Sequence, residues 1–172
     1  MKKKIIVATV VAALSLSVIG CGNGVNEKRL VELTGDKNFN QVKQAWQNSI
    51  LQEKPEDAKV YSYWLKENGQ KAQATFNADS FEQSFMMKYN KGIEDSKKKM
   101  SEMEKSVDKT IAEAKKQGYS EIDWNLPRAL RREKSNASFA AFSSAFVRNT
   151  YIPFLSKQLK KIDAANKELK RR

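Results

Sequence analysis

The strongest constraint on the fold of this chain is a long series of apolar residues at helical spacing. From Phe81 to Ala114, apolar residues recur near the period that places side chains on one face of an α-helix. Gly118 follows this series, at the kind of position where glycine commonly ends a helix. We therefore expect a helix over residues 79–117, either continuous or interrupted at Gly92, because glycine weakens a helix interior.

A second helical segment begins near Pro127, because proline suits the first turn of a helix. We assign Phe139 and Phe142 to its buried face, together with a series of leucines and isoleucines toward the C-terminus. Pro153 removes one backbone hydrogen bond and is expected to bend this helix near Asn149. The two long segments are expected to pack as an antiparallel helical hairpin.

A shorter helix is predicted before Pro55. Four apolar residues recur there at steps of three and four: Phe39, Val42, Trp46 and Ile50. Asn38 is a suitable N-cap, and the residue before a proline disfavours helical geometry. These signals predict a helix over residues 39–53.

The next segment has the alternating period of β-strands. Asn68-Gly69 is a strong signal for a two-residue hairpin turn. A turn at this position would place three pairs of apolar residues on one face: Tyr61 with Phe76, Tyr63 with Ala74, and Leu65 with Ala72. We therefore predict a β-hairpin over residues 60–77, with its apolar face packed on the helix at 39–53.

The resulting fold class is mainly α, of the α+β type: a long antiparallel helical hairpin with a short N-terminal helix and one β-hairpin. We assign residues 38–172 to this single, mostly helical domain. Residues 21–37 are assigned to a tether, with a short helical turn around Leu30 and Leu33.

The chain begins with a targeting segment rather than with part of the fold. Lysines at positions 2–4 precede an uncharged stretch, residues 5–19, that is too short for a membrane-spanning helix and is followed by Gly20-Cys21. This segment resembles the signal peptide of a bacterial lipoprotein, in which a small residue precedes a lipid-carrying cysteine. The alternative is an ordinary signal peptide with an unrelated cysteine. It would need an Ala-x-Ala-like cleavage site, which is absent at the end of the apolar stretch.

The resemblance covers residues 1–21 and implies removal of residues 1–20 and attachment of lipid to Cys21. Two or three acyl chains on one residue suffice for stable membrane attachment. In lipoproteins of two-membrane bacteria, Gly22 at the second mature position implies delivery to the outer membrane, facing the periplasm. We therefore expect a protein of the cell envelope that is held to a membrane through lipid on Cys21.

Composition excludes much of enzyme chemistry. The 172 residues include no His and one Cys, which removes His-based triads, His-ligated zinc, intramolecular disulfides and multi-cysteine metal sites. Two Ser-x-x-Lys sequences start at Ser96 and Ser106, but the companion motifs of penicillin-recognising enzymes are missing. We therefore expect a non-enzymatic protein without catalytic residues, cofactor or metal.

Charge is distributed unevenly along the mature chain. Residues 21–123 contain 17 basic and 17 acidic side chains, whereas residues 124–172 contain 12 basic and only 3 acidic ones. Two groups of basic residues are predicted to share helix faces and to contact an anionic partner: Arg128, Arg131 and Arg132, and Lys157, Lys160 and Lys161. Solubility alone is the competing explanation of this excess.

Export through the lipoprotein pathway argues against nucleic acid as the partner of this basic segment. Anionic lipid headgroups, a cell-wall polymer or an acidic protein surface remain. The sequence thus predicts a membrane-anchored envelope lipoprotein that binds an anionic partner through a basic C-terminal helix. The alternative is an adaptor or exclusion lipoprotein that docks on a membrane protein machine. Nothing in the sequence indicates the oligomeric state.

Overall fold

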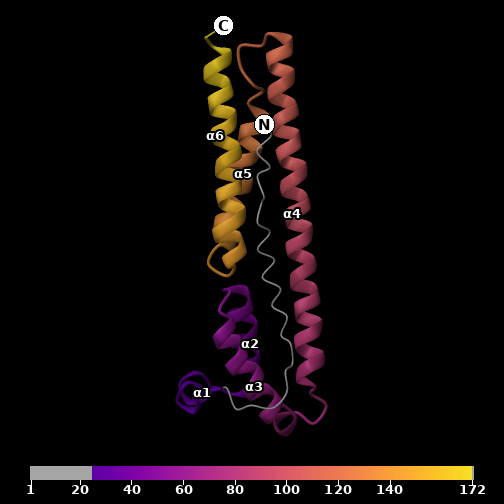
Figure 1. Cartoon of the computed structure of the whole chain (residues 1–172), viewed down its shortest axis with the longest axis vertical. Coiled ribbons are helices and arrows are strands. Elements are labelled where there is room, and N and C mark those ends of the chain that lie inside the picture. Colours follow the sequence, from indigo (N-terminus) through magenta and orange to yellow (C-terminus); the bar gives the residue numbers. More distant parts are fainter. Residues whose placement is uncertain (1–24, 172) are drawn as a thin grey trace, which may run out of the picture.

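The computed structural model of the chain describes residues 25–171, and this part consists of helices and turns without a strand. Cys21 and the targeting segment lie outside the described residues. The described elements, in chain order, are α1 (Glu27–Thr34), α2 (Phe39–Leu51), α3 (Pro55–Ala72), α4 (Ala78–Gln117), α5 (Asn125–Ala140), the π-helical turn η1 (Val147–Tyr151) and α6 (Ile152–Leu169) (Figure 1).

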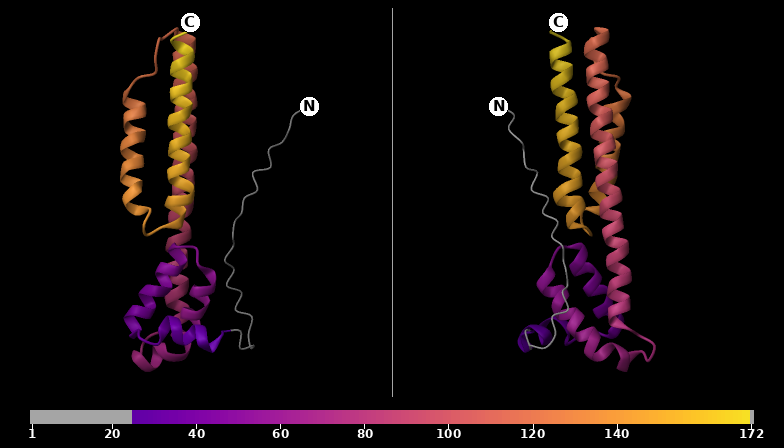
Figure 2. Two further views of the ribbon diagram at one scale, coloured as in Figure 1. Left: turned by 90° about the vertical axis from the view of Figure 1, so that its left-hand side faces the viewer. Right: turned by 45° about the vertical axis from the view of Figure 1, so that its right-hand side comes forward.

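The helix α4 extends along most of the molecule and is shared by two groups of helices (Figures 1 and 2). Its 40 residues correspond to a length of about 60 Å at the helical rise. The helices α1, α2 and α3 gather at its N-terminal half, whereas α5 and α6 accompany its C-terminal half. Because α5 runs back along α4 and α6 returns, this half has three helices in up–down–up order rather than the predicted two-helix hairpin.

The N-terminal half has its own core around Trp46. The Trp46 side chain is fully buried (0 % exposed), as is that of Val42 on the same helix, α2. Leu65 joins this core from α3. On α4, the rings of Phe81 and Phe85 have centroids 5.4 and 5.3 Å from that of the indole. The apolar face predicted for α2 is therefore its buried face.

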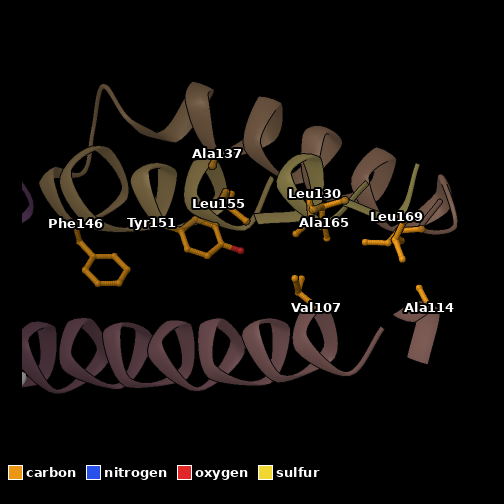
Figure 3. Close-up of a cluster of buried hydrophobic side chains, with 11 residues drawn as sticks. Val107, Ala114, Leu130, Ala137, Phe146, Tyr151, Leu155, Ala165 and Leu169 are labelled. Carbon is orange, nitrogen blue, oxygen red and sulfur yellow. The ribbon is translucent and has the colours of Figure 1, made fainter. Parts of the chain in front are cut away.

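A second core joins α4, α5 and α6 (Figure 3). Val107 of α4 and two residues of α6, Leu155 and Ile162, are fully buried, and Leu130 joins them from α5. The side-chain amide of Gln158 is buried as well, and within residues 25–171 neither its Nε2 nor its Oε1 has a hydrogen-bond partner. This apolar core therefore contains one buried amide without a partner among the described residues.

The two strongest predicted helices are confirmed as α2 and α4. Asn38 caps α2 in a reciprocal arrangement: its side chain accepts from the Gln41 N–H, and the Gln41 side chain accepts from the Asn38 N–H. The helix α4 is continuous through Gly92. It ends at Gly118, which has a φ of 70° and so adopts the left-handed conformation that glycine tolerates best.

The predicted β-hairpin at residues 60–77 is wrong, because this segment forms most of α3 and its connection to α4. Pro55 occupies the first turn of α3 and is followed by two acidic residues, which together favour a helix start. The alternating pattern also contains a helical one. Tyr61, Leu65 and Gly69 are buried at steps of four, as expected for one face of a helix.

The pair Asn68-Gly69 serves helix packing rather than a turn. The Asn68 Nδ2 donates to the Trp64 carbonyl at 3.1 Å, one turn earlier in α3. A Cβ atom at Gly69 would lie 2.4 Å from a ring carbon of Phe76, so the absence of a side chain allows this ring to approach the helix. Glycine at this position is therefore explained by a close contact and not by its backbone conformation.

The predicted second long helix is interrupted. The helix α5 ends before a turn at residues 141–144, where the chain reverses direction (Figure 2). Phe139, near the end of α5, and Phe142, in this turn, were expected in the core but are 80 and 87 % exposed. The buried positions of α5 include Leu130 and Ala137 instead.

The disturbance expected near Asn149 takes the form of the π-helical turn η1. The N–H of Ile152 donates to the carbonyl of Val147, five residues earlier. Pro153 follows directly and has no N–H with which to complete an α-helical bond to Asn149. The wider π turn is therefore the local consequence of a proline close to the start of α6.

Candidate functional site

The helix α5 has one buried face and one face that is open to solvent. Leu130 and Ala137 are buried on the side that packs on α6 (Figure 3). Positions about half a helical turn away are exposed. We call this exposed surface, with the N-cap residue, the outer face of α5: Trp124, Arg128, Arg131, Arg132, Ser135 and Phe139. Three of the six predicted anionic contacts therefore lie together on one surface.

The three arginines of the outer face are available to another molecule. The Arg128 guanidinium lies 4.8 Å from the ring centroid of Trp124, in a cation–π arrangement that leaves its charge uncompensated. Arg131 and Arg132 are exposed, and within residues 25–171 neither side chain forms an ion pair or a hydrogen bond. The outer face of α5 is thus a cluster of three positive charges without a carboxylate.

The one acidic residue of α5, Glu133, is turned toward the neighbouring elements. Its Oε1 accepts two hydrogen bonds of 2.7 Å, one from Lys99 Nζ on α4 and one from the Tyr151 hydroxyl on η1. The bond from Lys99 and, after it, the bond from Tyr151 lower the pKa of the Glu133 carboxyl. Glu133 is therefore ionised and neutralised within the protein, and it does not offset the arginines outside.

The cluster of Lys99, Glu133 and Tyr151 ties helices together rather than supplying a base. The hydrogen bond to Glu133 raises the pKa of Lys99, so the ammonium group stays charged at neutral pH. Burial raises the pKa of Tyr151, so the phenol keeps its proton. Because the pKa values of Lys99 and Tyr151 are both raised further above 7, neither side chain acts as a base at neutral pH. The cluster instead connects α4, α5 and η1 through its hydrogen bonds.

The three lysines that the sequence predicted to share a helix face lie at steps of three and four on α6, and two of them pair with acidic residues of α4. Lys157 Nζ lies 3.8 Å from a carboxylate oxygen of Glu104 on α4. Lys161 forms an ion pair with Asp108, one helical turn further along α4. Lys160 is exposed and has no ion-pair partner in the described part of the chain. The acidic residues of α4 thus pair with two of these lysines, whereas no ion pair within residues 25–171 involves the three arginines of α5.

The outer face continues into two exposed phenylalanines, Phe139 and Phe142, which we call the aromatic tip. Phe142 lies in the turn after α5, and side chains from two other elements hold this turn. Gln52, at the end of α2, donates from Nε2 to the Phe142 carbonyl at 2.8 Å. Arg148 of η1 donates from Nη1 to the Ala141 carbonyl at 2.9 Å, and its Nη2 lies 3.3 Å from Gln52 Oε1. The backbone beneath the exposed rings is therefore fixed.

Sequence reasoning missed the aromatic tip because it assigned both phenylalanines to the core. A signal for the correct assignment was present. Phe139 is nine positions after Leu130, which corresponds to a rotation of about 180° around a helix. If Leu130 is buried, Phe139 must face solvent in the same helix, as the structure shows.

A groove of about 460 Å³ lies between α2 and the start of α4. The ammonium group of Lys43 lies 5.6 and 5.2 Å from the ring centroids of Phe76 and Phe81, which line this groove, and 5.2 Å from that of Phe39. The chain's own cation therefore covers this aromatic surface. The outer face of α5 remains the stronger candidate for contact with another molecule.

The described residues contain no group of three or more Cys, Asp or Glu side chains arranged to hold a metal ion. Among the helices that the structure describes, none combines the length and the apolar character needed to cross a membrane. Comparison with protein-family models, with curated proteins and with solved structures finds no match to this chain. Cys21 lies outside the described residues, so its lipid attachment stays a prediction.

Proposed function

We propose that this chain is a non-enzymatic lipoprotein of the cell envelope, anchored through lipid on Cys21, that binds an anionic surface through the outer face of α5. The arginine cluster without a carboxylate carries this proposal, since Arg131 and Arg132 have no partner within residues 25–171. The signal segment supports a position on the outer membrane, facing the periplasm. The anionic surface is then an envelope component that lies within reach of the anchored domain.

The arrangement of charges argues against solubility as the whole explanation. The acidic residues of α4 pair with Lys157 and Lys161, and Glu133 is held by Lys99. Opposite charges thus compensate one another between helices, while the arginines of α5 remain uncompensated. A surface that only had to stay soluble would not require this separation, because interspersed charges of both signs serve that purpose.

A second candidate function is that of an adaptor or exclusion lipoprotein that docks on a membrane protein. The observation that favours it is the aromatic tip, since aromatic side chains and arginine are enriched at the centres of protein interfaces. Phe139 and Phe142 would then enter a pocket of the partner protein, and the arginines would contact its acidic rim. Both candidates use the same surface of α5.

Two measurements test the proposed function. Mass spectrometry of the mature protein should show an N-terminus at Cys21 with added acyl mass. An unmodified thiol, or an N-terminus elsewhere, would contradict the anchoring part of the proposal.

The anionic-contact part is tested with two variants of equal net charge. The α5 variant replaces three arginines by Gln: Arg128, Arg131 and Arg132. The α4 variant replaces three exposed lysines of α4, spaced seven residues apart, by Gln: Lys91, Lys98 and Lys105. On a cation-exchange resin, which is negatively charged, the α5 variant should elute at clearly lower salt than the α4 variant. Equal elution would show that only net charge matters, and would overturn the assignment of the contact surface to α5.

A further inference from the structure

The aromatic tip exposes apolar surface that the fold hides elsewhere. Phe139 and Phe142 are 80 and 87 % exposed, whereas Phe146, only a few residues later, is 8 % exposed in the core. Removing a phenyl ring from water is strongly favourable. Burial of these two neighbouring exposed rings by a partner would therefore release a large free energy. Contact between the aromatic tip and apolar surroundings outside the protein is therefore energetically favourable.

The rings are presented on a fixed turn. Gln52 and Arg148 hold the carbonyl groups of Phe142 and Ala141 through bonds of 2.8 and 2.9 Å. The π-helical turn η1 contributes to this arrangement because it carries Arg148. Contacts from Gln52 and Arg148 hold the backbone of the turn, so this backbone does not need to be ordered when the rings meet a partner.

Aromatic residues flank the arginines of the outer face at both ends, an arrangement that suits a bilayer surface. Trp124 is 60 % exposed at one end of α5, the aromatic tip lies at the other, and the arginines lie between them. Over the 16 residues of α5 this surface spans about 24 Å. Helices that lie in a membrane interface combine basic residues with Trp and Phe, and Trp is enriched at the level of the headgroups.

We propose that the outer face of α5 binds bilayers that contain anionic phospholipids, with its arginines at the lipid phosphates and the aromatic tip inserted beneath the headgroups. This inference rests on the anionic-contact function proposed above. Phosphates complement the arginines, and the layer beneath the headgroups supplies apolar surroundings for both rings at once. A polymer of sugars and carboxylates offers charge without that apolar layer, and an acidic protein surface would need a separate pocket for the rings.

The test uses the domain that starts at Gly22, which lacks the signal segment and the lipid. Every residue of the two cores lies between Leu33 and Leu169, so this domain keeps all of their contacts. It also lacks the only cysteine of the chain. A single cysteine in place of Ser143, next to the aromatic tip, can therefore be labelled with an environment-sensitive dye. A cysteine in place of Lys98, exposed on α4, provides the matched control.

The labelled domains are mixed with vesicles of equal parts phosphatidylglycerol and phosphatidylcholine, or of phosphatidylcholine alone. The dye at position 143 should shift to shorter wavelength and be quenched by a lipid-borne quencher only with phosphatidylglycerol present. The dye at position 98 should show neither change. Without any label, replacing either Phe139 or Phe142 by Ser should weaken vesicle binding roughly tenfold, because a buried ring contributes on that scale. Replacing Met87, an apolar residue that is 66 % exposed on α4, by Ser should change binding little.

Two results would overturn the proposal. In the first, the domain binds vesicles but the emission of the dye at position 143 does not change, which shows that the dye stays in water. In addition, the variants with Ser at position 139 or 142 bind as tightly as the unchanged domain. If in that case the α5 variant still elutes at lower salt than the α4 variant from the cation-exchange resin, the anionic-contact function stands. Only the insertion of the aromatic tip into the bilayer is then contradicted. The second is no preference for phosphatidylglycerol while a photo-crosslinker at Ser143 of the lipidated protein captures a membrane protein in intact envelopes. That result would assign the surface to a protein partner.

Discussion

Replacing Gly69 by Ala tests the contact between α3 and the chain that leads into α4. A Cβ atom at this position would lie 2.4 and 2.5 Å from two ring carbons of Phe76. The Phe76 ring has little freedom to move aside. It packs edge-on against Phe39 with centroids 4.8 Å apart, and it also contacts Phe81 at 5.7 Å. Gly92, in α4, provides the control, because nothing lies within 4 Å of a Cβ atom there.

The two substitutions should change stability in opposite directions. Replacing glycine by alanine inside a helix gains about 1 kcal/mol of helix propensity. At Gly92 this gain stands alone, so Gly92→Ala should stabilise the protein by about 1 kcal/mol. At Gly69, overpacking costs about 1–3 kcal/mol and outweighs the gain, so the expected net loss is about 1 kcal/mol. The two variants should therefore differ by about 2 kcal/mol in free energy of unfolding.

Urea unfolding of both variants, followed by circular dichroism, measures this difference. For a chain of this size, each kcal/mol also shifts the melting temperature by about 2–4 °C, which provides an independent readout. If Gly69→Ala stabilises the protein as much as Gly92→Ala does, the Phe76 ring does not lie against Gly69. The packing of α3 described above would then be incorrect.

Two further predictions concern buried polar groups. Burial raises the pKa of the Glu82 carboxyl, and the opposing effects of Ser62 and Lys66 are smaller, so the folded protein binds a proton more readily than the unfolded chain. Stability should therefore fall as pH rises from the ordinary carboxyl pKa through the raised one, and Glu82→Gln should flatten this dependence in melting curves across that range. The Gln158 amide is fully buried and has no hydrogen-bond partner in the described part of the chain, so Gln158→Leu should raise the free energy of unfolding by about 1–3 kcal/mol in urea titrations. A loss of stability in Gln158→Leu would show that the amide is paired.

The helices with complete local signals were predictable from the sequence. For α2, the apolar face around Trp46 and the cap at Asn38 predict the same helix, and the structure contains both features. For α4, the long apolar series and Gly118 both predict the observed helix, which continues through Gly92 although glycine costs about 1 kcal/mol relative to alanine there. In each case the local pattern and the tertiary packing favour the same structure.

The region around Asn68-Gly69 was not predictable because two periods coexist there. Tyr61 and Leu65 are four residues apart, so they fit both a strand face and a helix face. The turn signal at Asn68-Gly69 then favoured the strand. The start of α3 at Pro55, with two acidic residues in its first turn, favours the helix instead. The contact of Gly69 with Phe76, which explains the glycine, is visible only in the folded structure.

The candidate site was predicted in part. The arginines of α5 do share an exposed face, as the spacing of Arg128, Arg131 and Arg132 indicated. The pairing of Lys157 and Lys161 with α4 depends on which helix lies opposite, and the sequence does not specify that neighbour. The aromatic tip was missed for two reasons. The rotation of about 180° between Leu130 and Phe139 was not applied, and the turn at residues 141–144 was expected to be helical.

The measurement that tests the central claim most directly is the partitioning of the Gly22 domain onto vesicles containing phosphatidylglycerol. It compares the α5 variant with the α4 variant, which lose the same charge. Each arginine at an anionic bilayer surface contributes about 1 kcal/mol, so loss of all three should weaken binding on the order of 100-fold. The α4 variant should lose far less if α5 faces the membrane, because solution ions screen charges on other helices over about 8 Å. An equal loss in both variants would contradict the claim that the outer face of α5 is the contact surface.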